Sequence, residues 1–227
     1  MHENSRLLFE TYVRERLRPG DEVLEIGPDV VPSWVERAAG EGPFTWHTLD
    51  IDQRDELTYR ATDGYDFPID SDRYDVVLAC NVLEHVPKVW VWMRELARVC
   101  RPGGQVITIN PVSWPYHEVP VDCWRAYPEG MKALYDDAGL DVELSRCESL
   151  EPGGDKPHLP GRSFQWRAWK ERPELHRPGF LGRVLKRLGV SHKARMLRRA
   201  RWRDAMLGRV GIPVERAFDT VTIGIKR

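Results

Sequence analysis

Two short runs of the sequence are apolar at nearly every position, and they constrain the fold most. The run Val23–Ile26 reads VLEI, and the run Tyr74–Cys80 reads YDVVLAC. Strands that are buried on both faces have such continuous runs, whereas strands with one solvated face alternate apolar and polar residues. Apolar periodicity predicts helices at residues 5–17, before the first run, and 89–100, after the second. Because helical patterns separate these runs from each other and from later strand-like runs, we predict an α/β fold with a mostly parallel sheet and helices on both faces.

A glycine turn follows the first run, where the sequence continues Gly27, Pro28, Asp29. A strand, a glycine turn and a helix in this order often cradle a nucleotide-like ligand beyond the carboxyl ends of parallel strands. Dinucleotide sites carry further glycines in this loop, but here Asp29 and Val31 occupy those positions. A cofactor without a pyrophosphate needs close backbone approach at fewer points, so the loop disfavours a dinucleotide more than other nucleotide-like cofactors.

Carboxylates stand at or just past other predicted strand ends. Asp50 lies 23 residues beyond Gly27, near the end of a predicted strand at 44–52. At that spacing an acidic residue holds the ribose diol in nucleotide sites. Asp63 precedes Gly64 in the segment ATDGYDFPID. A single acidic residue at a strand end is more often a turn or cap residue, so the prediction depends on the whole set.

Four segments together resemble the class I S-adenosylmethionine-dependent methyltransferases: VLEIGP, HTLDID, ATDGYDFPIDSDRYDVVLACNVLEHVPK and ELARVCRPGGQVITINP. The resemblance covers about residues 17–142 and the final strand. It implies a Rossmann-like, seven-stranded sheet whose last strand is antiparallel and lies inside the sheet. It also implies an S-adenosylmethionine site at Glu25, Gly27, Asp50, Ile51, Asp63, Gly64, Asn81 and Val82. We add Asp29 as a candidate contact to the amino group of the cofactor.

The segment NPVSWPYHEVPVDCWRAYPEG, at 110–130, follows a predicted strand and therefore borders the pocket. His117 is the candidate general base, since an imidazole with a pKa of about 6.5 accepts a proton near neutrality. Asp122 would orient His117 or bind acceptor hydroxyls. The segment is similar to those of methyltransferases that modify sugars and glycans, so we expect transfer to a hydroxyl of a small molecule, first of all a sugar or glycoside. A structural loop with an exposed histidine is the alternative.

The motif NVLEHVP contains an adjacent carboxylate and imidazole, Glu84 and His85. Some O-methyltransferases of the ubiquinone pathway and of small RNAs, which this chain resembles, hold a divalent metal with such a pair. In this chain Asn81 stands where those enzymes carry a further Glu. This departure counts against a metal, and in metal-free relatives the histidine packs near the cofactor. The alternative is a Mg²⁺ site of Glu84, His85 and His117.

The C-terminal third is strongly basic. Residues 151–227 hold 19 Lys and Arg against 7 Asp and Glu, although the whole chain has a net charge of −1. We interpret residues 152–217 as a helical subdomain inserted into a single methyltransferase domain spanning residues 1–227. The basic stretch 182–209 would cap the acceptor pocket or form a homodimer contact. Alternatively, it would bind an anionic or lipid-linked acceptor or RNA, which makes an RNA methyltransferase the rival function.

Several classes of protein are disfavoured by the sequence. The cysteines, Cys80, Cys100, Cys123 and Cys147, form no CxxC pair, so we expect buried free thiols and no zinc site. The first ten residues do not resemble a secretory signal, and no stretch is long and apolar enough for a transmembrane segment, so we expect a cytoplasmic protein. Asp29 and Val31 leave a third hypothesis open, a partner protein of the same fold that has lost its cofactor.

Overall fold

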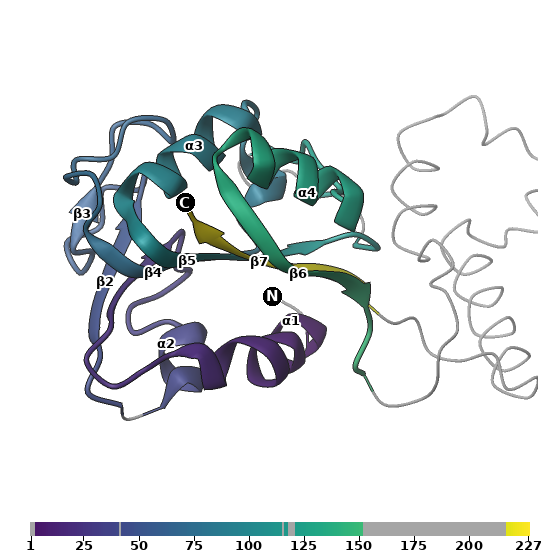
Figure 1. Cartoon of the computed structure of the whole chain (residues 1–227), viewed down its shortest axis with the longest axis horizontal. Coiled ribbons are helices and arrows are strands. Elements are labelled where there is room, and N and C mark those ends of the chain that lie inside the picture. The colour runs from purple at the N-terminus through teal and green to yellow at the C-terminus, as the bar shows by residue number, and fades with distance from the viewer. Residues whose placement is uncertain (1–2, 41, 115, 118–120, 152–216) are drawn as a thin grey trace, which may run out of the picture. The chain divides into compact units, whose positions relative to one another are not determined.

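The computed structural model describes residues 3–40, 42–114, 116–117, 121–151 and 217–227. The strands in these ranges are β1 (Glu22–Ile26), β2 (Thr45–Asp50), β3 (Tyr59–Arg60), β4 (Tyr74–Cys80), β5 (Cys100–Pro111), β6 (Leu140–Glu148) and β7 (Asp219–Lys226). They form one seven-stranded sheet in the order β3-β2-β1-β4-β5-β7-β6 (Figure 1). Strands β1 to β5 pair in parallel, whereas β7 pairs antiparallel with both β5 and β6. The predicted fold class and the antiparallel last strand inside the sheet are confirmed.

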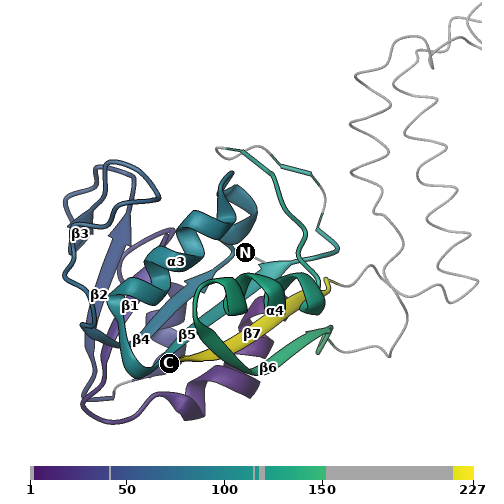
Figure 2. The ribbon, with the colours of Figure 1, turned by 45° about the horizontal axis from the view of Figure 1, so that its top comes forward.

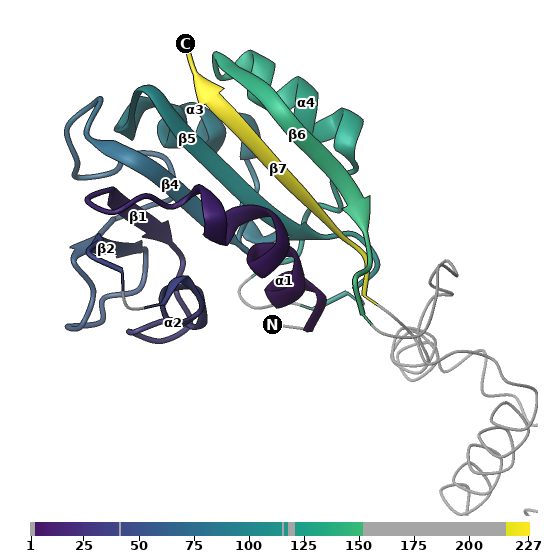
Figure 3. The same cartoon turned by 60° about the horizontal axis from the view of Figure 1, so that its bottom comes forward.

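Helices cover both faces of this sheet. The helical segments are α1 (Glu3–Leu8), the π-helical η1 (Phe9–Val13), the 3₁₀ turn η2 (Arg14–Arg16), α2 (Trp34–Ala39), the 3₁₀ turn η3 (Leu83–His85), α3 (Val89–Val99) and α4 (Pro128–Asp137). Helices α3 and α4 lie on one face, and α1 and α2 lie on the other, as Figures 1 and 3 show. This two-sided cover is why the strand sequences are apolar without alternation.

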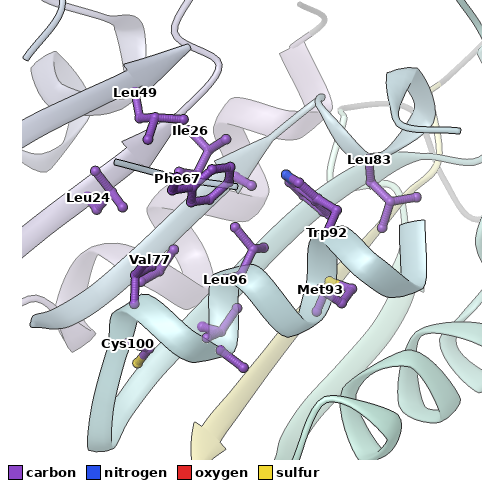
Figure 4. Close-up of a cluster of buried hydrophobic side chains, with 14 of the residues drawn as sticks. Leu24, Ile26, Leu49, Phe67, Val77, Leu83, Trp92, Met93, Leu96 and Cys100 are labelled. Atoms are coloured by element: carbon purple, nitrogen blue, oxygen red, sulfur yellow. The ribbon is translucent and has the colours of Figure 1, made fainter. Parts of the chain in front are cut away.

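The larger core lies under α3. Trp92, Met93 and Leu96 of this helix are completely or almost completely buried. They face Leu24 of β1 and Val77 of β4 in the close-up of Figure 4. Burying a side chain of this size contributes about 1.5–3 kcal/mol, so this contact fixes α3 over the centre of the sheet.

The second core joins the N-terminal helical segments to the opposite face. Leu8, Phe9 and Val13 are fully buried there against strand residues such as Val23 and Leu78. The start of the chain is also fixed by polar contacts, because the fully buried Asn4 donates from Nδ2 to Asp219 Oδ2 and to the Glu148 carbonyl, both at 2.9 Å. The N-terminal helix is therefore attached to the ends of β6 and β7.

Local signals explain where several elements begin and end. The Ser33 side chain accepts a hydrogen bond from the Glu36 amide at 2.9 Å and so caps α2. Pro128 starts α4, and Gly139 follows that helix with a φ of +77°. Both signals are readable from the sequence.

The structure differs from the sequence predictions in a few places. The helix predicted for residues 5–17 begins at Glu3 and changes from α to π to 3₁₀ geometry before it ends at Arg16. The strand predicted for 44–52 ends at Asp50, because the Asp50 carboxylate turns the chain by accepting the next two amides. The two-residue strand β3 was not predicted, since so short an edge strand has no periodicity.

The cysteine and insertion predictions have different outcomes. All four cysteines are free, but Cys123 is exposed, so the expectation that all would be buried is wrong. Among the described residues no helix has the length and apolar character needed to cross a bilayer. The predicted inserted subdomain 152–217, including the basic stretch 182–209, lies outside the described residues except for Ala217.

Candidate active site

The parallel strands bring several predicted residues to one edge of the sheet. Gly27 follows β1, Asp50 ends β2, and Asn81 follows β4. Hydrogen bonds hold the turns to neighbouring strands: the Gly27 amide donates to the Leu49 carbonyl, and the Asn81 amide donates to the Ile109 carbonyl, each at 2.8 Å. The carboxyl ends of β1, β2, β4 and β5 thus lie together at the edge of the sheet where the sequence predicts a ligand site.

Gly27 is required by both conformation and space. Its φ is +68°, and a Cβ at this position would lie 2.6 Å from the Val82 side chain. Neither Asp29 nor Val31 has a positive φ, so the non-glycine residues of this loop cause no left-handed strain. Asp29 is exposed and accepts the Val30 amide at its own Oδ1, at 3.0 Å. The loop after β1 can therefore adopt its conformation with Gly27 as the one glycine and other residues at the following positions.

Glu25 is the buried carboxyl of this edge, with only 3% of its surface exposed. Ser33 Oγ and Trp46 Nε1 both donate to its Oε2, at 2.7 and 2.9 Å. Burial raises the pKa of Glu25 to about 7, although the two hydrogen bonds act in the opposite direction. This carboxyl therefore titrates near neutral pH.

The two further carboxylates close turns with one oxygen each. Asp50 Oδ1 accepts the Ile51 and Asp52 amides at 2.7 and 3.3 Å. Asp63 Oδ1 accepts the Tyr65 amide at 2.7 Å and the amide after it at 3.1 Å. The side chain of Ile51 is 48% exposed at the same edge, and a Cβ on Gly64 would meet nothing within 4 Å. Both carboxylates thus stabilise the turns that follow them. Each would have to bind a ligand through its other oxygen.

The turn after β4 carries Asn81, Val82, Glu84 and His85. Asn81 has a φ of +57°, a conformation that asparagine tolerates better than most residues. Glu84 is 1% exposed, its Oε2 has no hydrogen-bond partner among the described residues, and burial raises its pKa to about 8. His85 Nδ1 contacts the Val121 carbonyl at 2.5 Å. Because a carbonyl only accepts hydrogen bonds, His85 carries its proton on Nδ1 in this contact.

His117 and Asp122 form the pair that the sequence predicted. His117 Nδ1 lies 3.3 Å from Asp122 Oδ2, and the His117 amide donates to the same oxygen at 2.8 Å. Arg125 adds two hydrogen bonds to the Asp122 carboxylate, at 2.5 and 2.6 Å. Burial acts to raise the pKa of Asp122, but Arg125 and the His117 amide hold it below its ordinary value. An ionised carboxylate therefore faces one nitrogen of the imidazole.

This pair lies beside the turn after β4. The rings of His85 and His117 meet edge to face, with 5.0 Å between centroids. Glu84, His85 and His117 each offer a ligand atom, and these atoms lie within 4.8 Å of one another. The segment after β5 passes along the sheet edge near the start of α3 (Figure 2), where the Cys123 amide donates to the Glu84 carbonyl at 2.6 Å. The structure thus joins the predicted base and the predicted metal ligands into one cluster.

Several exposed aromatic residues lie close in sequence to His117. Trp114, Tyr116, Trp124 and Tyr127 all belong to the segment between β5 and α4, and each exposes at least 38% of its surface. Trp124 is held by a hydrogen bond from its Nε1 to the Val86 carbonyl at 2.9 Å, and its ring meets that of Trp90 at 6.3 Å. Flat apolar surfaces of this kind suit the faces of a planar or ring-shaped ligand.

The sequence prediction missed two arginines of the edge. Arg125 stands three residues after Asp122, a spacing that could have suggested the ion pair. Arg54 contacts Asp50, four residues earlier in the chain, and also the loop after β1. No pattern in the sequence signals the contacts to that loop, because they join segments about 25 residues apart.

Comparisons with known proteins agree with this geometry. Residues 22–108 match the model of the family described as "Methyltransferase domain". The chain is 31% identical over 91 residues to the 27-O-demethylrifamycin SV methyltransferase of Amycolatopsis mediterranei, a match that covers 40% of this chain and 31% of that relative. The chain therefore spans about a third of the length of this curated relative.

Solved structures share the fold at low sequence identity. The YcgJ protein from Bacillus subtilis superposes with a TM-score of 0.55 and 16% identity, covering 100% of this chain and 99% of that one. Phosphoethanolamine N-methyltransferase 2 of Haemonchus contortus, solved with S-adenosyl-L-methionine, gives a TM-score of 0.53 at 14% identity, covering 99% of this chain and 52% of that one. At such identities the likeness concerns the fold alone.

Proposed function

We propose, on the premise that residues 22–108 form a class I S-adenosylmethionine-dependent methyltransferase domain with a Rossmann-like fold, that the protein transfers the methyl group of S-adenosylmethionine to a hydroxyl of a small molecule. A sugar or glycoside is our first candidate for the acceptor. The observation that carries the proposal is the His117–Asp122 pair beside the cofactor edge.

Methyl transfer to a hydroxyl needs alignment and removal of a proton. The acceptor oxygen displaces the sulfur of the sulfonium in line, so the methyl group moves to oxygen and the electron pair of the broken bond stays on sulfur. The hydroxyl proton must leave as the new bond forms. With Asp122 opposite Nδ1, the favoured proton position is Nδ1, which makes Nε2 of His117 the basic nitrogen. Arg125 keeps Asp122 ionised and so favours that tautomer.

The surroundings of this pair support our choice of acceptor class. The exposed aromatic side chains of the segment between β5 and α4 suit the apolar faces of a sugar ring, and the His117 side chain, which is 30% exposed, is open to one of its hydroxyls. The name of the rifamycin-modifying relative specifies a methyl group on oxygen, which favours an oxygen acceptor over a nitrogen one.

Replacement of His117 tests the proposed base. We expect His117→Ala to bind S-adenosylhomocysteine within about twofold of the wild-type affinity and to lose turnover by about 10²–10⁴-fold, the usual contribution of general base catalysis. Turnover is followed as S-adenosylhomocysteine formed with a panel of monosaccharides, disaccharides and aryl glycosides, corrected for the rate without acceptor. Unchanged turnover of the variant would remove His117 from the mechanism, and activity with none of the sugars would remove the sugar class.

The cluster of Glu84, His85 and His117 favours a second arrangement, a bound divalent cation. The donor set fits an ion in number and spacing, since the ligand atoms lie within 4.8 Å and the buried Glu84 Oε2 has no partner among the described residues. The Nδ1 contact of His85 also leaves Nε2 as its basic nitrogen. One carboxylate and two imidazoles suit a first-row transition ion better than the predicted Mg²⁺, which prefers oxygen ligands. Such an ion would lower the pKa of an acceptor hydroxyl.

His117 is the general base in the first arrangement and a metal ligand in the second, so one experiment separates the two. An imidazole that ligates a metal through its basic nitrogen does not accept a proton there. Titration with Co²⁺, followed by visible absorption, reports direct coordination without any acceptor, and the Glu84→Gln variant serves as the matched control. Saturable absorption that Glu84→Gln abolishes supports the ion. Full turnover after dialysis against EDTA, with no such absorption, contradicts it.

A further inference from the structure

Arg54 connects the two loops that flank the expected position of the ribose. It lies four residues after Asp50, in the chain between β2 and β3. Its Nη2 donates to the Pro28 carbonyl at 2.5 Å, and its Nη1 donates to the Asp29 carbonyl at 3.2 Å. The same Nη2 lies 3.3 Å from Asp50 Oδ2. One guanidinium therefore ties the turn after β1 to the carboxylate that ends β2.

The hydrogen-bond capacity of Asp50 limits what can be added to it. A carboxylate offers about four lone-pair sites. Two amides already occupy Oδ1, those of Ile51 and Asp52, and Arg54 occupies Oδ2. A ribose diol donates two hydrogen bonds, so one of the present donors must withdraw when it binds. The two amides are fixed by the turn, which leaves the 3.3 Å contact of Arg54 as the one that is exchanged.

The remaining contacts of Arg54 are independent of Asp50. The hydrogen bonds to the two loop carbonyls need no carboxylate, and the guanidinium stays charged at any ordinary pH. The Arg54 side chain is only 25% exposed, and its Nε is buried without a hydrogen-bond partner among the described residues. The two hydrogen bonds to the loop carbonyls therefore hold the Arg54 side chain in place. They keep the loop after β1 at a fixed distance from β2 while Asp50 changes its hydrogen-bond partner.

We propose that Arg54 is a positioning residue of the cofactor site: it holds the turn after β1 against Asp50 in the cofactor-free protein and yields Asp50 Oδ2 to the ribose diol when S-adenosylmethionine binds. This inference rests on the proposed function, because it presupposes that Asp50 receives the ribose. It adds to that function a residue that orders the site before the cofactor arrives.

Isothermal titration of the full chain with S-adenosylhomocysteine tests the proposal. We expect Arg54→Met to weaken binding about tenfold, because without its charge-assisted hydrogen bonds the loop after β1 is no longer held in line with Asp50, and the Asp50 carboxylate then meets the ribose diol less well. Arg54→Lys should recover most of the affinity, since the ammonium still reaches a loop carbonyl. Arg60→Met is the matched control: Arg60 belongs to the neighbouring β3, and its partner Asp55 has a side chain that is 97% exposed. The control should bind within about twofold of wild type.

A double variant shows whether Arg54 acts through the ribose contact. In an Asp50→Asn background the diol loses its carboxylate, so we expect Arg54→Met to change the affinity by less than about twofold there. If the two losses instead multiply, Arg54 acts as a general support of the fold and the proposal is overturned. A thermal midpoint measured on every variant separates weak binding from partial unfolding.

The outcomes also distinguish this proposal from the one it rests on. Absence of saturable binding by the wild-type chain at millimolar S-adenosylhomocysteine refutes the methyltransferase function. Binding by wild type together with unchanged or tighter binding by Arg54→Met refutes only the role of Arg54.

Discussion

Replacement of Glu25 by Gln should remove a pH dependence from the stability of the fold. Glu25 is 3% exposed, and both of its donors, Ser33 and Trp46, reach the same oxygen. Glutamine has nearly the same shape as the protonated carboxyl and keeps an oxygen for these donors. The substitution therefore removes the titration while changing little else.

The sign and size of the effect follow from the raised pKa of Glu25. Its pKa is about 7 in the folded chain, against an ordinary value of 4.5. Between those values the folded state binds more protons than the unfolded state, so the free energy of unfolding falls as pH rises. At about 1.4 kcal/mol for each pKa unit, the full loss above pH 7 is about 3 kcal/mol, of which about 2 kcal/mol falls between pH 5 and pH 8.

Urea unfolding at pH 5 and pH 8, followed by tryptophan fluorescence without cofactor, measures this difference. Glu25→Gln should become more stable relative to wild type by about 2 kcal/mol over that interval. Glu129→Gln, the same chemical change at a side chain that is 84% exposed, should follow the wild type at both values. If Glu25→Gln and wild type lose stability in parallel, the reasoning from burial is wrong.

Two further predictions concern backbone conformation and the N-terminal helix. Gly27→Ala should destabilise the fold by about 1–3 kcal/mol and weaken S-adenosylhomocysteine binding more than tenfold, because the φ of Gly27 is +68° and a Cβ would lie 2.6 Å from a neighbouring side chain. Gly20→Ala is the control, since Gly20 has a φ of +93° but open space around it. This variant should lose stability but keep its affinity for S-adenosylhomocysteine in calorimetry. Asn4→Ala should lower the free energy of unfolding by about 1–3 kcal/mol, because the buried Asp219 and the Glu148 carbonyl each lose the hydrogen bond from Asn4, although Ser5 still donates to Asp219 at 3.2 Å. Arg6→Ala, which breaks ion pairs at the surface of the same helix, should lower the free energy of unfolding much less in the same denaturation experiment, and equal losses for the two variants would contradict the argument.

The sequence predicted elements well where apolar patterns and end signals coincide. The strand at Tyr74–Cys80 has the predicted bounds, and α3 differs from its predicted range, 89–100, by one residue. The helix at the N-terminus was harder, because its apolar pattern does not distinguish α from π or 3₁₀ geometry. The predictions on residues 152–216 stay predictions, since the structure does not describe that stretch.

Some features of the candidate site could be predicted from the sequence, and others could not. Residues that follow a strand, such as Gly27, Asp50 and Asn81, were predictable, because the carboxyl ends of parallel strands share one edge. Contacts between loops were not predictable. The contacts of Arg54 with the turn after β1 depend on how that turn meets the chain after β2, whereas Asp122 and Arg125 lie three residues apart in one segment, a spacing that could have suggested their ion pair.

The amino-acid order alone determined that this chain forms a mostly parallel sheet covered on both faces, with acidic residues at one edge, because burial periodicity and strand ends are local properties. Only the tertiary structure decided which side chains meet there, since hydrogen bonds and ion pairs require atoms within about 3–4 Å. No spacing along the chain brings His85 to His117 or makes the Glu25 carboxyl titrate near neutrality. Those properties arise from the packing that excludes water around them.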